Sequence, residues 1–225
     1  RSAAGAKVGG SARLKEGVAR RGNLVRKPSP ASKTPTPSKA SVTQVTGEGI
    51  VLVGVSTGGP PALEKLLEPL HGKFGWPVVI AQHMPATFTG ALAKRLDRLC
   101  ALEVSEVTRL TRLDPGHVYI ARGGGDIVIS GRPGGPIVMP APAQKDYLWQ
   151  PSVDRLVRTA MDHVPARQLV GVMLTGMGND GAKAMADLKA SGGQTIAESE
   201  ESAVVWGMPG ELVKAGGADW VTPVS

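Results

Sequence analysis

The chain has 225 residues and a formal net charge of +7, a length that suits one globular domain and an appendage. Residues 1–48 hold ten Lys and Arg against two Glu, whereas the remaining residues hold sixteen against seventeen Asp and Glu, so the positive charge belongs to the N-terminal segment. A nucleic-acid-binding fold would carry its basic patch on the folded body, with aromatic side chains to stack bases, and none of the eight aromatic residues lies in residues 1–48. We therefore expect no nucleic-acid partner.

Neither membrane insertion nor a disulfide bond is expected. No run of about 18 apolar residues is present, and the basic N-terminus lacks the apolar stretch of a signal peptide. Cys100 is the only cysteine, which excludes an internal disulfide, and its place in a helical apolar pattern indicates a buried structural thiol. These features together predict a cytoplasmic protein.

Residues 1–48 differ in composition from the rest of the chain. They are rich in Ala, Gly, Ser, Pro and Lys, and this composition predicts a basic disordered linker or tail that is removable without loss of the core. The chain begins with Arg1 and not with Met, so we expect that a segment upstream has been removed. A folded domain is predicted for residues 49–225.

From Gly49 onward, continuous apolar stretches alternate with segments whose apolar residues recur at helical spacing. In chain order we predict a buried strand at 49–55, a helix at 60–70, a strand at 77–82, a helix at 88–100, short β segments within 103–139, a helix at 153–164, a strand at 169–174, a helix at 182–191, a strand at 194–197, a helix at 209–215 and a strand at 219–221. This alternation predicts an α/β fold with a doubly wound, mainly parallel sheet and helices on both faces.

The middle of the chain has a different sequence pattern. Three short β segments, HVYIA, DIVIS and PIVM, are separated by glycine-rich turns within residues 103–139. Such turns favour hairpins, so an antiparallel hairpin region is predicted there.

Ser56 lies at the turn between the first strand and the first helix, in the pattern Gly-x-Ser-x-Gly of residues 54–58. Small neighbours at such a turn leave the hydroxyl exposed, and the helix that follows offers free N–H groups to a developing negative charge. A glycine-rich turn of this kind serves equally well as a phosphate cradle. The Walker pattern and the Gly-x-Gly-x-x-Gly spacing are both absent.

A serine needs a neighbouring base to become a nucleophile. Of the four histidines, only His83 ends a predicted buried strand; His71 and His163 lie near helix ends and His117 opens a β segment after a turn. The carboxyl ends of parallel strands form the rim where sites are found in such sheets, so His83 is the candidate base. The alternative is a histidine satisfied within the core.

The candidate partner for the base is Asp180. It lies in the stretch Thr175–Gly181, which follows a buried strand and holds three glycines in seven residues. A carboxylate there would orient the imidazole of His83, although Asp180 also suits a plain helix cap. The residue order Ser, His, Asp differs from the Ser, Asp, His order of ordinary α/β-hydrolases.

Five blocks of sequence resemble the CheB protein-glutamate methylesterases. They begin at Val53 (VGVSTGGP), Gln82 (QHMP), Gln150 (QPSVD), Leu174 (LTGMGNDG) and Val204 (VVWGMP), and the match spans residues 49–222. The resemblance implies that residues 49–225 are a catalytic domain that removes methyl esters from glutamates of methyl-accepting chemotaxis receptors and also deamidates receptor glutamines. It further implies backbone N–H groups near Thr57 and Met177 as oxyanion donors, with no metal or organic cofactor.

The chain departs from this family in two places. The family usually carries a phosphorylatable receiver domain before the linker, which makes such a domain, in the same chain or a separate one, an expected partner. Many members also read Ala-Pro-Gly near a histidine where this chain has Ala121-Arg-Gly-Gly-Gly-Asp126, a change that bears on receptor contacts. A small-molecule esterase with an enclosed apolar pocket and a phosphate-binding module remain the alternatives.

Overall fold

The computed structural model describes residues 49–224. The predicted tail, residues 1–48, lies outside the described residues. The strands are β1 (Ile50–Val55), β2 (Val78–Gln82), β3 (Glu103–Val107), β4 (Thr111–Arg112), β5 (His117–Ala121), β6 (Asp126–Arg132), β7 (Gly135–Ala141), β8 (Leu169–Met173), β9 (Gln194–Glu198) and β10 (Trp220–Thr222). The helices are α1 (Gly59–Leu67), α2 (Ala86–Leu99), α3 (Val153–His163), the 3₁₀ turn η1 (Ala166–Gln168), α4 (Ala182–Ala190) and α5 (Met208–Lys214).

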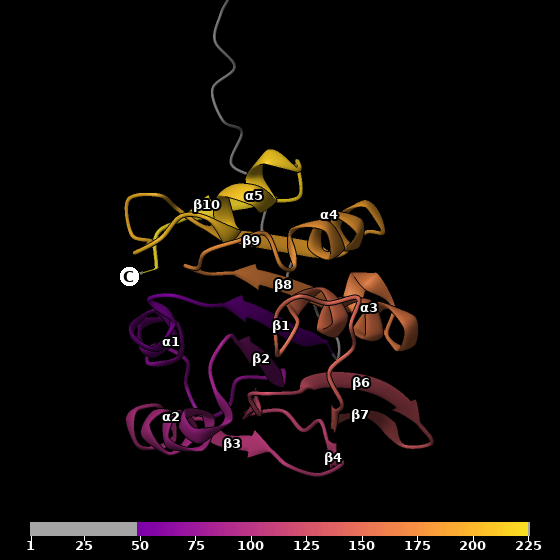
Figure 1. Cartoon of the computed structure of the whole chain (residues 1–225). Helices are drawn as coiled ribbons and strands as arrows, with labels where there is room; N and C mark the ends of the chain where they lie inside the picture. Colours follow the sequence, from indigo (N-terminus) through magenta and orange to yellow (C-terminus); the bar gives the residue numbers. More distant parts are fainter. Residues whose placement is uncertain (1–48, 225) are drawn as a thin grey trace, which may run out of the picture. The chain divides into compact units, whose positions relative to one another are not determined.

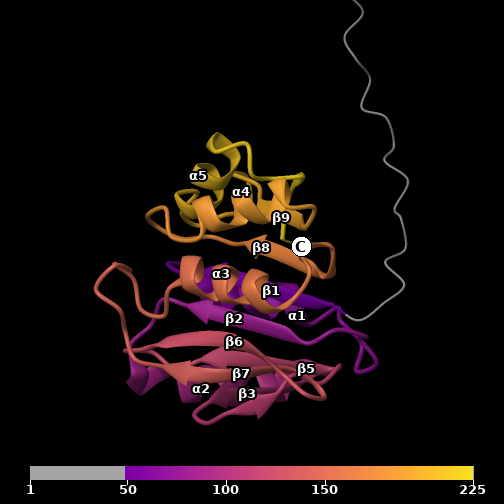
Figure 2. The same ribbon diagram turned by 90° about the vertical axis from the view of Figure 1, so that its right-hand side faces the viewer.

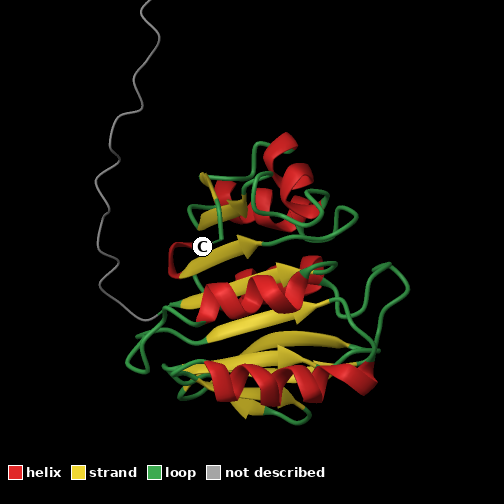
Figure 3. Cartoon of the chain, turned by 90° about the vertical axis from the view of Figure 1, so that its left-hand side faces the viewer, coloured by secondary structure: helices red, strands yellow, loops and turns green. Residues whose placement is uncertain are grey.

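A seven-stranded parallel sheet in the order β10-β9-β8-β1-β2-β5-β3 forms the centre of residues 49–224. Helices α1 and α2 lie on one face of this sheet and α3 and α4 on the other, as Figure 1 shows. Figure 3 looks onto the face that α1 and α2 cover. The predicted doubly wound α/β fold is confirmed.

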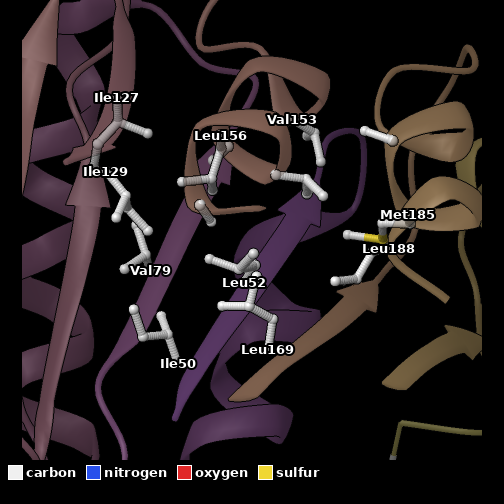
Figure 4. Packing of buried hydrophobic residues seen from close by; sticks show 14 of the residues in the cluster. Ile50, Leu52, Val79, Ile127, Ile129, Val153, Leu156, Leu169, Met185 and Leu188 are labelled. Carbon is white, nitrogen blue, oxygen red and sulfur yellow. The ribbon is translucent and has the colours of Figure 1, made fainter. Parts of the chain in front are cut away.

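Two apolar cores follow from the alternation of side chains along the parallel strands. In β1, Ile50 and Leu52 belong to the core on the α3 side, whereas Val53 and Val55 belong to the core on the α1 side. Figure 4 shows the first core, with Leu156 of α3 facing the strands. Burial on both faces explains why the strands read as continuous apolar stretches.

A second, three-stranded antiparallel sheet in the order β4-β7-β6 packs beside α3. Figure 2 shows β6 and β7 on the α3 side of the parallel strands. Ile127, Ile129 and Val138 of this sheet are buried in the same core as Leu156. The predicted hairpin region is therefore present.

The assignment of HVYIA to that hairpin region is wrong. This segment forms β5, which lies between β2 and β3 in the parallel sheet. Residues 118–121 are all buried, which is typical of a strand covered on both faces and not of a hairpin with one solvated face. The neighbouring glycine-rich turns led to the opposite interpretation.

Candidate active site

The three segments singled out in the sequence meet at one edge of the parallel sheet. Ser56 follows β1, His83 follows β2 and the loop Thr175–Gly181 follows β8, and these strands are neighbours in the order β8-β1-β2. Backbone hydrogen bonds join their ends: the His83 N–H donates to the Val55 carbonyl (3.0 Å) and the Ser56 N–H donates to the Thr175 carbonyl (2.9 Å). The edge is the carboxyl end of the strands, where open α/β sheets place their sites.

His83 and Asp180 form a buried polar contact at this edge. The His83 Nε2 lies 2.8 Å from Asp180 Oδ2, and the two side chains are 9 % and 3 % exposed. Because an ionised carboxylate only accepts hydrogen bonds, this contact places a hydrogen on Nε2, and in the neutral imidazole Nδ1 then carries a lone pair. Nδ1 is buried and has no hydrogen-bond partner among the described residues.

Asp180 is held by the first turn of α3. Its carboxylate accepts hydrogen bonds from the N–H groups of Val153 (2.7 Å) and Asp154 (3.1 Å) and from the Ser152 hydroxyl (3.1 Å). These free N–H groups and the positive end of the helix dipole favour a negative charge at this point. The sequence left open whether Asp180 is a plain helix cap. It does cap a helix, but that helix is α3 and not α4, the helix that follows Asp180.

Ser56 has a fixed backbone and an unpaired side chain. Its carbonyl accepts hydrogen bonds from the Gly59 N–H and from Gln82 Nε2, both at 2.9 Å. The hydroxyl makes no hydrogen bond to another residue in the range 49–224, so Ser56 and the candidate base His83 are not joined by a direct hydrogen bond in this structure. The half-buried Ser56 side chain can still rotate about χ1.

Thr57 and Met177 present backbone N–H groups beside Ser56. Neither N–H donates to another residue of the described part of the chain. Thr57 is exposed and Met177 is 69 % exposed, so both residues are at the surface of the rim. The Thr175 hydroxyl ties the two turns together, because it donates to the Thr57 carbonyl at 2.9 Å within the same network.

Gly176 allows the β8 loop to approach Ser56. A Cβ at Gly176 would lie 2.7 Å from the Cβ of Ser56 and 2.5 Å from the sulfur of Met208. Such distances are too short for any side chain, so only glycine permits this approach.

The supports of Asp180 were missed by sequence reasoning. Asp126 and Arg155 form an ion pair with 2.6 Å between Oδ2 and Nη1, and Asp126 Oδ1 accepts the Ser152 N–H at 2.8 Å. This pair fixes Ser152 against Asp180. The QPSVD block indicates that a helix begins there. No local sequence pattern indicates that the start of this helix contacts Asp180.

The loop 121–126 lies beside His83. A Cβ at Gly123 would collide with the backbone of Met84 and Pro85, so the loop packs closely against the segment that follows the imidazole. Asp126, at the end of this loop, is 2 % exposed and belongs to the support of α3 described above. The departure from the family pattern therefore falls next to the site.

Four pockets are formed by residues in the range 49–224, and Ser56, His83 and Asp180 line none of these four. Within the same range, no cluster of three His, Cys, Asp or Glu side chains is placed to hold a metal ion. No helix in the described range is long and apolar enough to cross a bilayer.

The model of the family described as CheB methylesterase matches residues 51–225. The chain belongs to the CheB methylesterase family. A solved structure, the CheB methylesterase catalytic domain of Thermotoga maritima, superposes with a TM-score of 0.76 at 37 % identity, over 79 % of this chain and 94 % of that one.

Curated relatives of this CheB domain carry the name protein-glutamate methylesterase/protein-glutamine glutaminase. One from Rhodopseudomonas palustris is 59 % identical over 176 residues, 78 % of this chain and 48 % of the relative. Another from Rhodospirillum rubrum is 52 % identical over 196 residues, 87 % of this chain and 52 % of the relative. The chain thus spans about half the length of these relatives.

Proposed function

We propose that this domain is a serine hydrolase that removes methyl esters from glutamate side chains of methyl-accepting chemotaxis receptors in the cytoplasm, and that it deamidates receptor glutamines by the same chemistry. The observation that supports this best is the buried His83–Asp180 pair, which leaves Nδ1 as a base at the edge where Ser56 follows β1. The names of the relatives support the choice of substrate.

In the proposed reaction, the Ser56 hydroxyl attacks the ester carbonyl and its proton passes to His83 Nδ1. The N–H groups of Thr57 and Met177 stabilise the oxyanion. His83 then returns the proton to the departing methoxide, which leaves as methanol. A water molecule, deprotonated by the same nitrogen, hydrolyses the glutamyl-serine ester and restores the hydroxyl; with a glutamine substrate the leaving group is ammonia.

The exposure of Thr57 and Met177 next to this edge favours a macromolecular substrate over a small diffusible ester. A small-molecule esterase encloses its substrate in an apolar pocket, and none of the four pockets described above is lined by Ser56, His83 or Asp180. A side chain presented on a receptor helix needs no such enclosure. A receiver domain, in the same chain or a separate one, is the regulatory partner that we expect.

Release of methanol from methyl-labelled receptor fragments tests the proposal. We expect Ser56→Ala and His83→Ala to abolish the release to a similar extent, because members of a triad act as a unit. Asp180→Ala should cost less, because the aspartate orients the base without exchanging protons. Ser191→Ala and His71→Ala, which change a serine and a histidine elsewhere on the domain, are the matched controls and should retain activity.

If folded Ser56→Ala kept near-normal activity, the nucleophile would be misassigned. The glycine-rich turn before α1 would then be better explained as a phosphate cradle, a role for which His83 and Asp180 are dispensable.

A further inference from the structure

The indole of Trp149 lies against the imidazole of His83. The ring centroids are 6.0 Å apart and the planes differ by 9°. Trp149 belongs to the segment between β7 and α3, so it reaches the site from a different part of the chain than the strand that carries His83. This separation and orientation fall within the range of favourable aromatic pairs.

Trp149 also contacts the β8 loop. A Cβ at Gly178 would lie 2.7 Å from Cζ2 of the indole, so the ring fills the space above this glycine. Gly178 has a φ of 98°, a conformation that favours glycine on its own account. The indole therefore lies between His83 and the loop that carries Met177.

His83 has one hydrogen bond to hold its ring. The contact of Nε2 with Asp180 fixes one corner of the imidazole, whereas Nδ1 has no partner within residues 49–224. A ring held at one corner can still rotate about its bond to Cβ, and such rotation moves Nδ1. An indole parallel to the imidazole, with 6.0 Å between the ring centroids, opposes that rotation.

We propose that Trp149 is a positioning residue that fixes the plane of the His83 imidazole and so keeps Nδ1 available to Ser56. This inference rests on the proposed function, because it assigns to His83 the role of general base. The indole face also favours the imidazolium that forms when His83 accepts the proton, since a cation is attracted to an aromatic face.

A different role would be contact with the receptor. Leu148, the preceding residue, is 84 % exposed, so this segment also faces the outside of the rim. The two roles predict different responses to a reagent that reacts with Ser56 without touching a receptor surface. A small fluorophosphonate is such a reagent, because its reaction depends on the activated hydroxyl alone.

The experiment compares Trp149→Ala, Trp149→Phe and Trp220→Ala. Trp220 lies on β10 at the far edge of the sheet and is 44 % exposed, so it controls for the loss of a tryptophan. We measure kcat and KM for methanol release from a methylated receptor fragment, and the rate at which the fluorophosphonate labels Ser56. A ¹⁵N-histidine spectrum reports the tautomer of His83 in each variant.

We expect Trp149→Ala to lower kcat and the labelling rate together, by about tenfold, with KM changed less than about twofold. Trp149→Phe, which keeps an aromatic face, should restore most of both rates, and Trp220→Ala should match the unmodified chain. The His83 signal should report hydrogen on Nε2 in every variant, because Asp180 and not Trp149 sets the tautomer, so a slower rate cannot be attributed to a change of tautomer.

Unchanged rates in folded Trp149→Ala overturn the inference. A raised KM with an unchanged labelling rate also overturns it, because Trp149 would then contact the receptor. If Trp149→Ala does not fold, Trp149→Leu, which keeps apolar bulk without an aromatic face, is judged by the same criteria. Activity retained in Ser56→Ala or His83→Ala would instead refute the proposed function, whatever Trp149 does.

Discussion

Asp180 and Asp154 cap each other's helices. Asp180 stands just before α4 and accepts hydrogen bonds from the first turn of α3, whereas Asp154 lies in that first turn and accepts the Ala184 N–H of α4 at 3.0 Å. The exchange locks the start of α3 to the start of α4. The carboxylate that contacts His83 is therefore held by the first turn of α3, which is itself tied to α4 through Asp154.

The charge of Asp154 should cost stability at neutral pH. Burial raises the pKa of Asp154, and the nearby charge of Asp180 raises it further, against the opposing effects of the Ala184 N–H and Arg158. A carboxyl with a higher pKa in the folded state binds its proton more tightly there, so stability falls as the pH rises from about 3.8 through the raised pKa.

Asp154→Asn keeps an oxygen for the Ala184 N–H and removes the charge. We expect its free energy of unfolding to exceed that of the unmodified chain at about pH 7, with the difference vanishing as the pH falls below the unfolded pKa near 3.8. Urea unfolding at several pH values measures this. Asp154→Ala, which also loses the cap, should be less stable than Asp154→Asn throughout. A lower stability of Asp154→Asn at pH 7 would mean that attraction to Arg158 outweighs burial.

Ser152→Ala should lower both stability and activity. Its hydroxyl accepts the Arg155 N–H as the cap of α3 and donates to Asp180. Loss of such a cap costs about 1 kcal/mol, seen as a shift of the urea midpoint, and Asp180 loses one of its donors. We expect kcat for methanol release to fall several-fold. An unchanged kcat beside reduced stability would limit Ser152 to capping α3.

Gly176→Ala should disrupt the junction between the β8 loop and Ser56. The added methyl group meets Ser56 and Met208, and overpacking of this kind costs about 1–3 kcal/mol. Gly75→Ala is the matched control, because a Cβ there meets nothing within 4 Å. Thermal melts and fluorophosphonate labelling compare the two. Equal behaviour of the two variants would show that the close approach at Gly176 has no consequence.

Cys100 should not contribute to catalysis. Burial raises the pKa of its thiol, so the reactive thiolate is scarce at neutral pH. We expect iodoacetamide at neutral pH to leave methanol release intact, whereas the fluorophosphonate abolishes it. Inactivation by iodoacetamide that Cys100→Ser prevents would contradict this expectation.

The sequence predicted what depends on local pattern. The continuous apolar stretches predicted β1, β2 and β8, and the rule that sites lie at the carboxyl ends of parallel strands brought Ser56, His83 and Asp180 to one edge. The prediction that β5 belongs to a hairpin was wrong, because it relied on the neighbouring glycine-rich turns and not on the continuous apolar character of the strand.

Local sequence patterns could not predict the contacts that hold Asp180 and His83 in place. The contacts of Ser152 and Asp154 with Asp180, and of Trp149 with His83, join segments far apart in the chain. No periodicity or spacing encodes which helix a distant carboxylate will cap, because that pairing is decided by how α3 and α4 pack on the sheet.

The strand order also determines when, during synthesis, Asp180 can contact His83 and complete the proposed site. His83 and Asp180 are 97 residues apart, and β8, which carries the Asp180 loop, pairs directly with β1. A ribosome releases Ser56 and His83 long before β8, and contacts so distant in sequence form late. Under the proposed mechanism, a nascent or partly unfolded chain carries the serine without an oriented base, and we expect no hydrolysis by it until β8 has paired with β1.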